Sequence, residues 1–281
     1  MSIVDSTEAK SILRRPAIYT DFYELTMAQG YFLSGRKDER ACFDYFFRDI
    51  PFEGGYVVFA GISDLLEILD SFRFHEDELQ YLADQGFRSE FLSYLRDFKF
   101  SADIYSAKEG EIVFPREPIV RVEGTIIEAQ ILETLLLNIL NFESLMATEA
   151  ARMKYAAGKH KVLDFGLRRA QGYGGIQASK AAIIGGVEAT SNVYSSFVHN
   201  IPASGTMAHS WIQSFEDELT AFRTYAKYYP DECILLVDTY DTLGSGIPNA
   251  IKVAKELEEH GQKMKGVRLD SVELAYFSRK A

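Results

Sequence analysis

The spacing of hydrophobic and polar positions changes along the chain, and the change divides the sequence near residue 125. In the first part, apolar residues recur at helical spacing in some segments and in short strand-like runs in others. The expected helices are 21–33, 62–72, 76–84 and 90–98, and the expected strands are 42–47, 56–60 and 118–124. Because helices and strands do not alternate regularly here, residues 1–125 are predicted to form an α+β domain.

A long pattern of helical spacing at 127–158 opens the second part, and short apolar runs follow it. The runs expected as strands are 161–165, 190–194, 233–238 and 265–270, with helical patterns at 176–186, 215–229 and 248–261 between them. Strands that alternate with helices are typical of parallel β/α units. Residues 126–281 are therefore predicted to form an α/β domain, built either as a β/α barrel or as an open doubly wound sheet.

Composition narrows the possible partners. The 281 residues carry a net charge of −11, which argues against nucleic acid as a ligand because its binding depends on basic contacts to phosphate. No apolar run approaches the ~20 residues of a membrane helix, and the first residues lack the layout of a secretion signal. The two cysteines lie far apart without a CxxC motif, so no zinc site or disulfide framework is expected and a reduced, cytoplasmic compartment is predicted.

Polar motifs follow the predicted strands at their C-terminal ends, the end that carries the active site in both candidate architectures. The stretch DFGLRRAQGYGG pairs Arg168 and Arg169 with several glycines directly after a strand. Arginine forks grip carboxylates and phosphates, and a glycine-rich loop that enters a helix lets backbone amides approach an anion. Anion binding is the favoured interpretation, and a surface arginine pair beside a flexible loop is the alternative.

Two other strand ends are less specific. LLVDTYDTLGSG offers Asp238, Asp241 and a turn before a helix, which suits a polar pocket with an anion-receptive helix start. An ordinary strand exit with a capping aspartate explains that motif equally simply, and on its own is favoured. In RLDS, Arg268 and Asp270 lie two residues apart on the same face of a strand, where they could meet a phosphate and a sugar diol. A structural salt bridge between them is the alternative.

His209 stands in IPASGTMAHSWIQ, and the serine and glycine before it favour turn and loop geometry. A loop built to present the imidazole would suit a nucleophile or a proton carrier, since this side chain titrates near neutral pH. A packed or merely exposed histidine is the commoner situation, so the local pattern alone leaves its role open.

Several motifs occur together and in order: TDFYELTMAQGYF, FRDIPFEGGYVVFAG, LETLLLNILNF, DFGLRRAQG, IPASGTMAHS, LLVDTYDTLGSGIPNA and GVRLDS. With them the chain resembles the nicotinate phosphoribosyltransferases over essentially its whole length. The resemblance implies an α+β domain joined to an incomplete β/α barrel of the type II phosphoribosyltransferase kind. It also implies synthesis of nicotinate mononucleotide and diphosphate from nicotinate and phosphoribosyl diphosphate. ATP as co-substrate, Mg²⁺ with the phosphates, and a homodimer with shared active sites are implied as well.

The resemblance also assigns roles to residues of this sequence. It implies that His209 is phosphorylated by ATP, that Tyr23 stacks on the pyridine ring, and that Asp21 and Phe22 shape the same corner. It implies that Arg168 or Arg169 holds the nicotinate carboxylate, with Thr206, Asp238, Arg268 and Asp270 against the phosphoryl and phosphoribosyl groups. No protein-bound metal site is expected apart from the Mg²⁺ that accompanies the phosphates.

Two departures from the family pattern affect these expectations. Where the family commonly reads RLDSGDL, this chain has Val272 and Glu273 after Ser271. The chain also stops at Ala281, before the later barrel strands and the ribose 5-phosphate loop that the family implies, so the 281 residues alone are expected to be inactive. A related nicotinamide or quinolinate phosphoribosyltransferase and a truncated, non-catalytic binding partner remain alternatives; the arginine pair favours an acidic ring.

Overall fold

The computed structural model describes residues 15–270 and 273–281, and the chain forms two compact units. One unit ends at Ala203 and the other runs from Ser204 to Ala281. The sequence predicted a domain boundary at 125/126, which is instead the point where strand β5 (Val120–Thr125) passes directly into helix α5 (Ile126–Ala157). Helix α5 belongs to the first unit because its apolar residues, among them Ile127, Leu132 and Leu135, pack into that unit's core.

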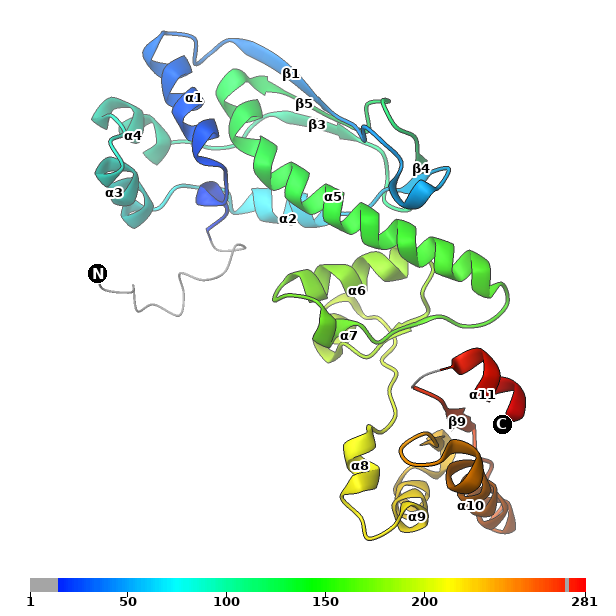
Figure 1. Cartoon of the computed structure of the whole chain (residues 1–281). Coiled ribbons are helices and arrows are strands. Elements are labelled where there is room, and N and C mark those ends of the chain that lie inside the picture. The colour runs from blue at the N-terminus through cyan, green and yellow to red at the C-terminus, as the bar shows by residue number, and fades with distance from the viewer. Residues whose placement is uncertain (1–14, 271–272) are drawn as a thin grey trace. The chain divides into compact units, whose positions relative to one another are not determined.

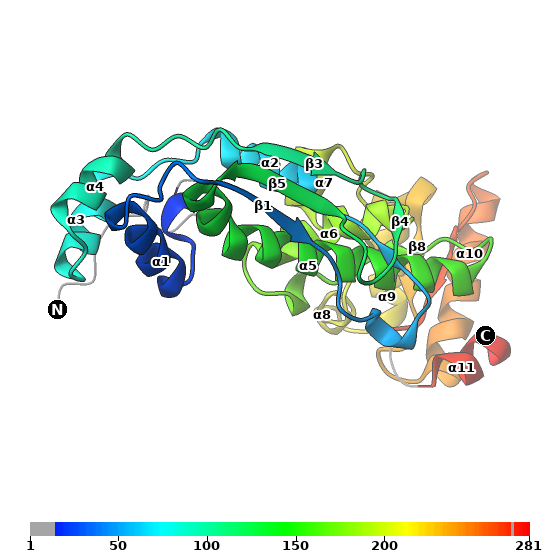
Figure 2. The same ribbon diagram turned by 90° about the horizontal axis from the view of Figure 1, so that it is seen from above.

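Helix α5 is the central element of the first unit. A capping box fixes its start: Thr125 Oγ1 accepts from the Glu128 amide at 3.3 Å, while the Thr125 amide donates to Glu128 Oε2 at 2.9 Å. The helix runs beneath the three-stranded sheet, as Figures 1 and 2 show from two directions. No membrane span was expected from the sequence, yet α5 is long and apolar enough for one. The packing of α5 explains why it is so apolar, because its apolar side chains form part of the core of this unit.

The three-stranded sheet is antiparallel, with β5 between β1 (Arg40–Tyr45) and β3 (Asp103–Ser106). Buried Val120 and Val122 alternate with exposed Arg121 along β5, so one face packs on the core and the other is solvated. A two-stranded ribbon, β2 (Val57–Val58) with β4 (Ile112–Val113), completes the unit's antiparallel pairs. The strands expected at 42–47, 56–60 and 118–124 are confirmed, whereas β3 and β4 were not predicted.

All four helices predicted in the first 125 residues are present. They are α1 (Phe22–Leu33), α2 (Ile62–Asp70), α3 (Glu76–Asp84) and α4 (Ser89–Arg96). Helices α1, α3 and α4 gather near the start of α5 (Figure 1). Aromatic rings hold this end together: Phe72 packs against Phe98 at 6.0 Å, and the Phe91 side chain is fully buried.

The rest of the first unit is one parallel β/α step. Strand β6 (Leu163–Asp164) pairs in parallel with β7 (Ala189–Thr190), and α6 (Gly174–Ile184) connects them while packing on α5. The strand expected at 190–194 is wrong beyond its first residue. Strand β7 ends at Thr190, and α7 (Val193–His199) begins within the same segment. The Asn192 side chain accepts from the Ser195 amide at 3.2 Å and so caps a helix where the sequence pattern predicted a strand.

The second unit repeats this parallel arrangement. Strand β8 (Ile234–Leu236) pairs with β9 (Gly266–Arg268) and is covered by α9 (Glu218–Tyr228) and α10 (Ile247–Glu259) around Phe222, Leu235 and Val253. A π-helical turn, Thr242–Gly246, leads into α10. The short helices α8 (His209–Gln213) and α11 (Leu274–Lys280) complete the unit, and 3₁₀ turns occupy Pro16–Ile18, Pro51–Glu53, Leu167–Arg169 and Pro230–Glu232.

Candidate functional site

The carboxyl ends of β8 and β9 bring several predicted site residues of the second unit together. Asp238 follows β8, and its Oδ2 accepts from the Asp270 amide, which follows β9, at 2.6 Å. Asp270 Oδ1 in turn accepts from the Arg268 guanidinium at 2.7 Å. Because parallel strands end at the same edge, the polar residues after them meet there, as the sequence predicted.

His209 joins this cluster from α8. It is the first residue of that short helix and not part of a loop, so the loop expected from the serine and glycine ends one residue earlier, at Ala208. Its Nδ1 lies 3.1 Å from Thr239 Oγ1, and its Nε2 lies 3.8 Å from Asp270 Oδ2. The imidazole therefore has a polar neighbour at each nitrogen while about a third of its surface stays open to solvent.

Arg268 ties the segment before His209 to this strand edge. Its guanidinium donates to Thr206 Oγ1 at 3.0 Å and to the Met207 carbonyl at 3.2 Å, besides its bond to Asp270. The salt bridge weighed as an alternative for RLDS is thus present. The same contacts bring Thr206, Arg268 and Asp270 into one hydrogen-bonded group.

The Asp241 carboxylate bonds to the backbone of the turn that follows it and not to a pocket. Its carboxylate accepts from the Gly244 amide at 2.9 Å and caps the π-helical turn that leads into α10. The ordinary strand exit is therefore the better interpretation of this part of the motif, since the helix start already has its own carboxylate. Within residues 15–270 and 273–281, no group of three or more histidine, cysteine, aspartate or glutamate side chains is arranged to hold a metal ion.

Asp164 fixes the glycine-rich stretch in the first unit. Its carboxylate accepts from the Gly166 amide at 2.8 Å and from the hydroxyls of Ser179 and Thr190, each at 2.7 Å. These bonds join the end of β6 to α6 and β7. The turn that carries the arginine pair, Leu167–Arg169, therefore starts from a well-anchored point.

Beside this turn, the first unit has a cleft of about 620 Å³. Tyr19, Asn138, Phe142, Arg169, Tyr173 and Gln177 are among its lining residues, whereas Arg168 is not. Burial, together with the acidic side chains of Asp64, Glu143 and Glu67, raises the pKa of Tyr173 to about 12, so its hydroxyl stays protonated near neutral pH. One cation among aromatic rings and neutral polar groups suits a planar, singly charged anion.

Asp21 and Tyr23, at the start of α1, bond to residues in the first half of α5. Neither they nor Phe22 line this cleft. The Tyr23 hydroxyl donates to Glu133 at 3.3 Å, and Thr134 Oγ1 donates to Asp21 at 3.1 Å. Burial and the neighbouring Glu133 raise the pKa of Tyr23 to about 12. Nearly half of the Tyr23 surface, 47%, remains exposed, so its ring is open to a stacking partner.

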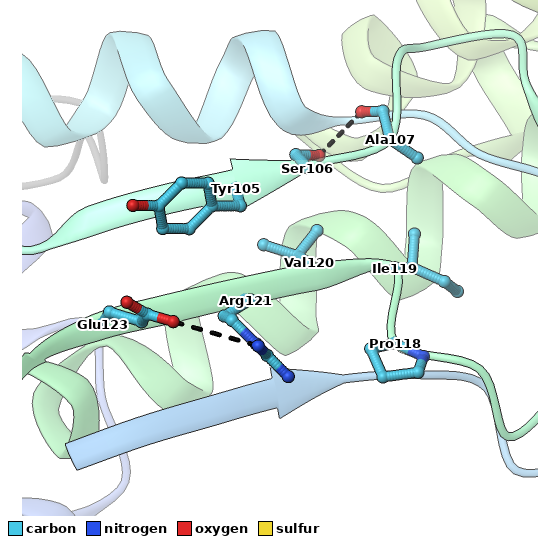
Figure 3. Close-up of a pocket in the computed structure, with 8 residues that line it drawn as sticks. All are labelled: Tyr105, Ser106, Ala107, Pro118, Ile119, Val120, Arg121 and Glu123. Carbon is cyan, nitrogen blue, oxygen red and sulfur yellow. Dashed lines mark hydrogen bonds and ion pairs between the residues drawn. The ribbon is translucent and has the colours of Figure 1, made fainter.

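A second cleft lies on the solvated face of the antiparallel sheet, where Tyr105 and Arg121 project from β3 and β5 (Figure 3). Arg121 donates to both oxygens of Asp44, at 2.8 and 3.1 Å, and lies 3.9 Å from Glu123. Two carboxylates thus neutralise the arginine here. This cleft is a weaker candidate for an anionic substrate than the one beside Arg169.

Thr239 is the residue of the second unit's cluster that sequence analysis missed. It follows Asp238 in the motif DTYDT, and the position directly after a strand end is the available signal. Hydroxyl-bearing residues are common in such turns, so the signal is not specific. Only the fold brings it within hydrogen-bond distance of His209, thirty residues away.

Short parallel β/α steps that follow an α+β region, with polar groups at the strand ends, are the elements of the type II phosphoribosyltransferase fold. The crystal structure of human nicotinic acid phosphoribosyltransferase superposes with a TM-score of 0.86 at 34% identity, covering 93% of this chain and 63% of that one. A nicotinate-nucleotide pyrophosphorylase from Pyrococcus furiosus shares the fold, with a TM-score of 0.76 at 24% identity over 97% of this chain and 61% of its own.

Sequence comparison gives the family. Residues 18–141 match the N-terminal domain of nicotinate phosphoribosyltransferase. The Bacillus subtilis nicotinate phosphoribosyltransferase is 49% identical over 94% of this chain and 54% of its own length, and Arabidopsis thaliana nicotinate phosphoribosyltransferase 2 is 38% identical over 94% and 57%. The chain belongs to the nicotinate phosphoribosyltransferase family. It spans about half the length of the curated relatives it matches.

Proposed function

We propose that this chain is part of an enzyme that makes nicotinate mononucleotide and diphosphate from nicotinate and phosphoribosyl diphosphate, coupled to ATP hydrolysis through a phosphohistidine. The observation that carries the proposal is the position of His209 at the carboxyl ends of β8 and β9, with Thr239 at one ring nitrogen and Asp270 near the other. The names of the relatives support the transfer of a phosphoribosyl group to nicotinate.

In the ATP step, a lone pair on the His209 imidazole attacks the γ-phosphorus, a nitrogen–phosphorus bond forms, and the bond to the bridging oxygen breaks as ADP leaves. The Thr206 hydroxyl would donate a hydrogen bond to a phosphoryl oxygen. Mg²⁺ supplies charge neutralisation when it accompanies the phosphates, and the carboxylates of Asp238 and Asp270 are oxygen ligands of the kind it prefers. The hydrogen bond between Thr239 Oγ1 and His209 Nδ1 holds the ring's orientation, and when Nδ1–H is the donor, Nε2 keeps the lone pair that attacks.

Thr239→Val should therefore slow phosphorylation of His209. One neutral hydrogen bond contributes about 0.5–1.5 kcal/mol, so we expect a loss of roughly 2- to 10-fold in the rate of phosphorylation by ATP. Thr239→Ser keeps the hydroxyl and should keep the rate. Rapid-quench labelling with radioactive ATP measures both. Equal rates for the valine and serine variants would show that Thr239 does not orient the imidazole.

In the sugar-transfer step, the pyridine nitrogen attacks C1 of the ribose as diphosphate departs, so positive charge develops on the sugar. Positioning and electrostatics then supply most of the catalysis. We assign the nicotinate carboxylate to Arg169, because it lines the cleft with Tyr173 and Arg168 does not. Tyr23 stacks on the ring, and Arg268 with Asp270 meets the phosphoribosyl group.

We also propose that the enzyme works as a homodimer in the cytoplasm. Phe22 and Met27 expose 55% and 40% of their surfaces on α1, although both side chains are large and apolar. A second copy would cover these residues. Both cysteines are free thiols, Cys233 buried and Cys42 exposed, which suits a reducing compartment.

The proposed reaction is tested by product formation. Two proteins are compared: this chain alone, and a chimaera in which it is followed by the part of the Bacillus subtilis enzyme beyond the matched residues. Each receives phosphoribosyl diphosphate and ATP with nicotinate, nicotinamide or quinolinate, and nucleotides are separated by chromatography. We expect the chimaera to form nicotinate mononucleotide only from nicotinate. Product from nicotinamide or quinolinate, with none from nicotinate, would contradict the proposal.

A further inference from the structure

A buried group of charged side chains lies behind the cleft of the first unit, where α2, α5 and α6 meet. Glu143 is completely buried and Asp64 is 7% exposed. Lys180 Nζ lies 2.5 Å from Asp64 Oδ1 and 3.9 Å from Glu109 Oε1. One ammonium therefore faces three carboxyl groups. If all three were ionised, the group would hold an excess of two negative charges largely shielded from water, which is costly.

The contacts of Glu143 show how this cost is avoided. Its Oε1 accepts from Gln177 Nε2 at 3.1 Å. Its Oε2 is buried and receives no hydrogen bond from the described residues, while Asp64 lies within hydrogen-bond reach of the same carboxyl group. Two neighbouring acids satisfy this arrangement when one of them carries a proton. Because Asp64 is paired with Lys180, the proton resides on Glu143.

Electrostatics agrees with this geometry. Burial, followed by the hydrogen bond to Asp64 and its charge, raises the pKa of Glu143 to about 9, although Lys180 opposes the shift. Burial lowers the pKa of Lys180, but the bond to Asp64 and the nearby carboxylates outweigh it, so the pKa is raised overall and the ammonium stays charged. The other groups that face this cluster are Glu67 on α2, Glu109 before β4, and Tyr173 and Tyr194 beside α6.

Glu143 is linked directly to the cleft. Gln177, which bonds to it, and Phe142, its chain neighbour, both line the cleft with Arg169. On the other side, Gly61 at the start of α2 adopts a φ of +103°, and a Cβ placed there would lie 3.3 Å from Glu143 Cβ. Helix α2 thus packs tightly against α5 at this point, close to the Cβ of Glu143.

We propose that Glu143, in its neutral form, is a positioning residue for the cleft: it accepts from Gln177 through one oxygen and donates to Asp64 through the other, joining α2, α5 and α6 behind Arg169. Ionised, it would lose the bond to Asp64 and repel it. The wall formed by Gln177 would then loosen. As a statement about ligand binding, this inference rests on the proposed function; as a statement about Glu143 and Gln177, it does not.

The direction of the pH effect follows from the raised pKa. A carboxyl group whose folded pKa lies above its unfolded value contributes stability that is complete below the unfolded value and is lost as pH rises through the folded one. For Glu143, that window runs from the ordinary glutamate range to about pH 9. Stability of the first unit should decline across this window, whereas order at Gln177 should be lost near its upper end, where Glu143 ionises in the folded protein.

Glu143→Gln is the decisive variant because glutamine has the shape and the hydrogen-bonding pattern of a neutral glutamic acid but no proton to lose. Glu143→Met fills the same space without hydrogen bonds, and Glu149→Gln on the same helix is the matched control. Each protein is followed from pH 6 to 10 by its urea midpoint, by exchange of the Gln177 side-chain amide in NMR spectra, and by its nicotinate dissociation constant.

Between pH 7 and 10, we expect the wild type and Glu149→Gln to unfold at lower urea concentrations, to lose protection of the Gln177 side-chain amide and to bind nicotinate at least tenfold more weakly. Glu143→Gln should keep all three properties. Glu143→Met should lack the amide protection at every pH. If no protein binds nicotinate but the first two readouts behave as expected, the ring assignment fails and the role of Glu143 stands. A Glu143→Gln profile that falls in parallel with the wild type would overturn the inference.

Discussion

His209→Ala should abolish ATP hydrolysis by the chimaera while leaving the fold intact. The imidazole is the nucleophile in the proposed ATP step, and neither Thr239 nor Asp270 beside it can form a comparable phosphoramidate. Removing a nucleophile that forms a covalent intermediate eliminates the step rather than slowing it. We therefore expect ADP release to fall below detection, measured as nicotinate-dependent ADP formation.

The control for this result is structural. His209 is partly exposed and lies on a helix of only five residues, so its loss should change the thermal unfolding temperature little. Circular dichroism of wild type and variant tests this. ADP formation at the wild-type rate by a folded His209→Ala protein would show that the histidine is not the acceptor.

The second large effect concerns the choice of an acidic ring. Arg169→Ala removes a charge-assisted bond to the nicotinate carboxylate worth about 1.5–3 kcal/mol, so we expect nicotinate to bind roughly 10- to 150-fold more weakly. Nicotinamide, which lacks the carboxylate, should lose little. Arg169→Lys keeps the charge but not the two-pronged geometry, and an intermediate loss is expected. Isothermal titration with both ligands measures the difference.

Arg168→Ala is the matched control for this prediction. The two arginines are neighbours on the same turn and are both exposed, yet only Arg169 lines the cleft. Arg168→Ala should leave the preference for nicotinate over nicotinamide unchanged. If Arg168→Ala abolishes that preference and Arg169→Ala does not, the carboxylate is held by the other arginine and the cleft is not the ring site.

The long, strongly periodic elements could be predicted from sequence, and the short ones could not. Helix α5 repeats its apolar positions over many turns, so its pattern is unambiguous. Strands β3 and β4 are only four and two residues long and mostly exposed, so little periodicity exists to detect. At 190–194 the sequence pattern resembles a strand, but the side chain of Asn192 caps the start of α7.

The candidate site shows the same limit. The polar residues after β8 and β9 were predictable because parallel strands end at one edge, which is a rule of topology. The partner of His209 was not, because Thr239 is brought to it by packing across thirty residues. Sequence left Arg168 and Arg169 equivalent, since adjacent residues on a turn can point in different directions and only the fold gives one of them a cleft.

The proposed coupling of ATP hydrolysis to sugar transfer rests on one covalent bond, and mapping that bond is its most direct test. The chimaera is incubated with γ-labelled ATP, digested at alkaline pH, and its phosphopeptides are sequenced by mass spectrometry. The predicted result is an acid-labile, base-stable phosphate on His209 that disappears when nicotinate and phosphoribosyl diphosphate are added. A stable phosphate on another residue, or nicotinate mononucleotide formed with ATP consumption but without any phosphate on His209, would contradict it.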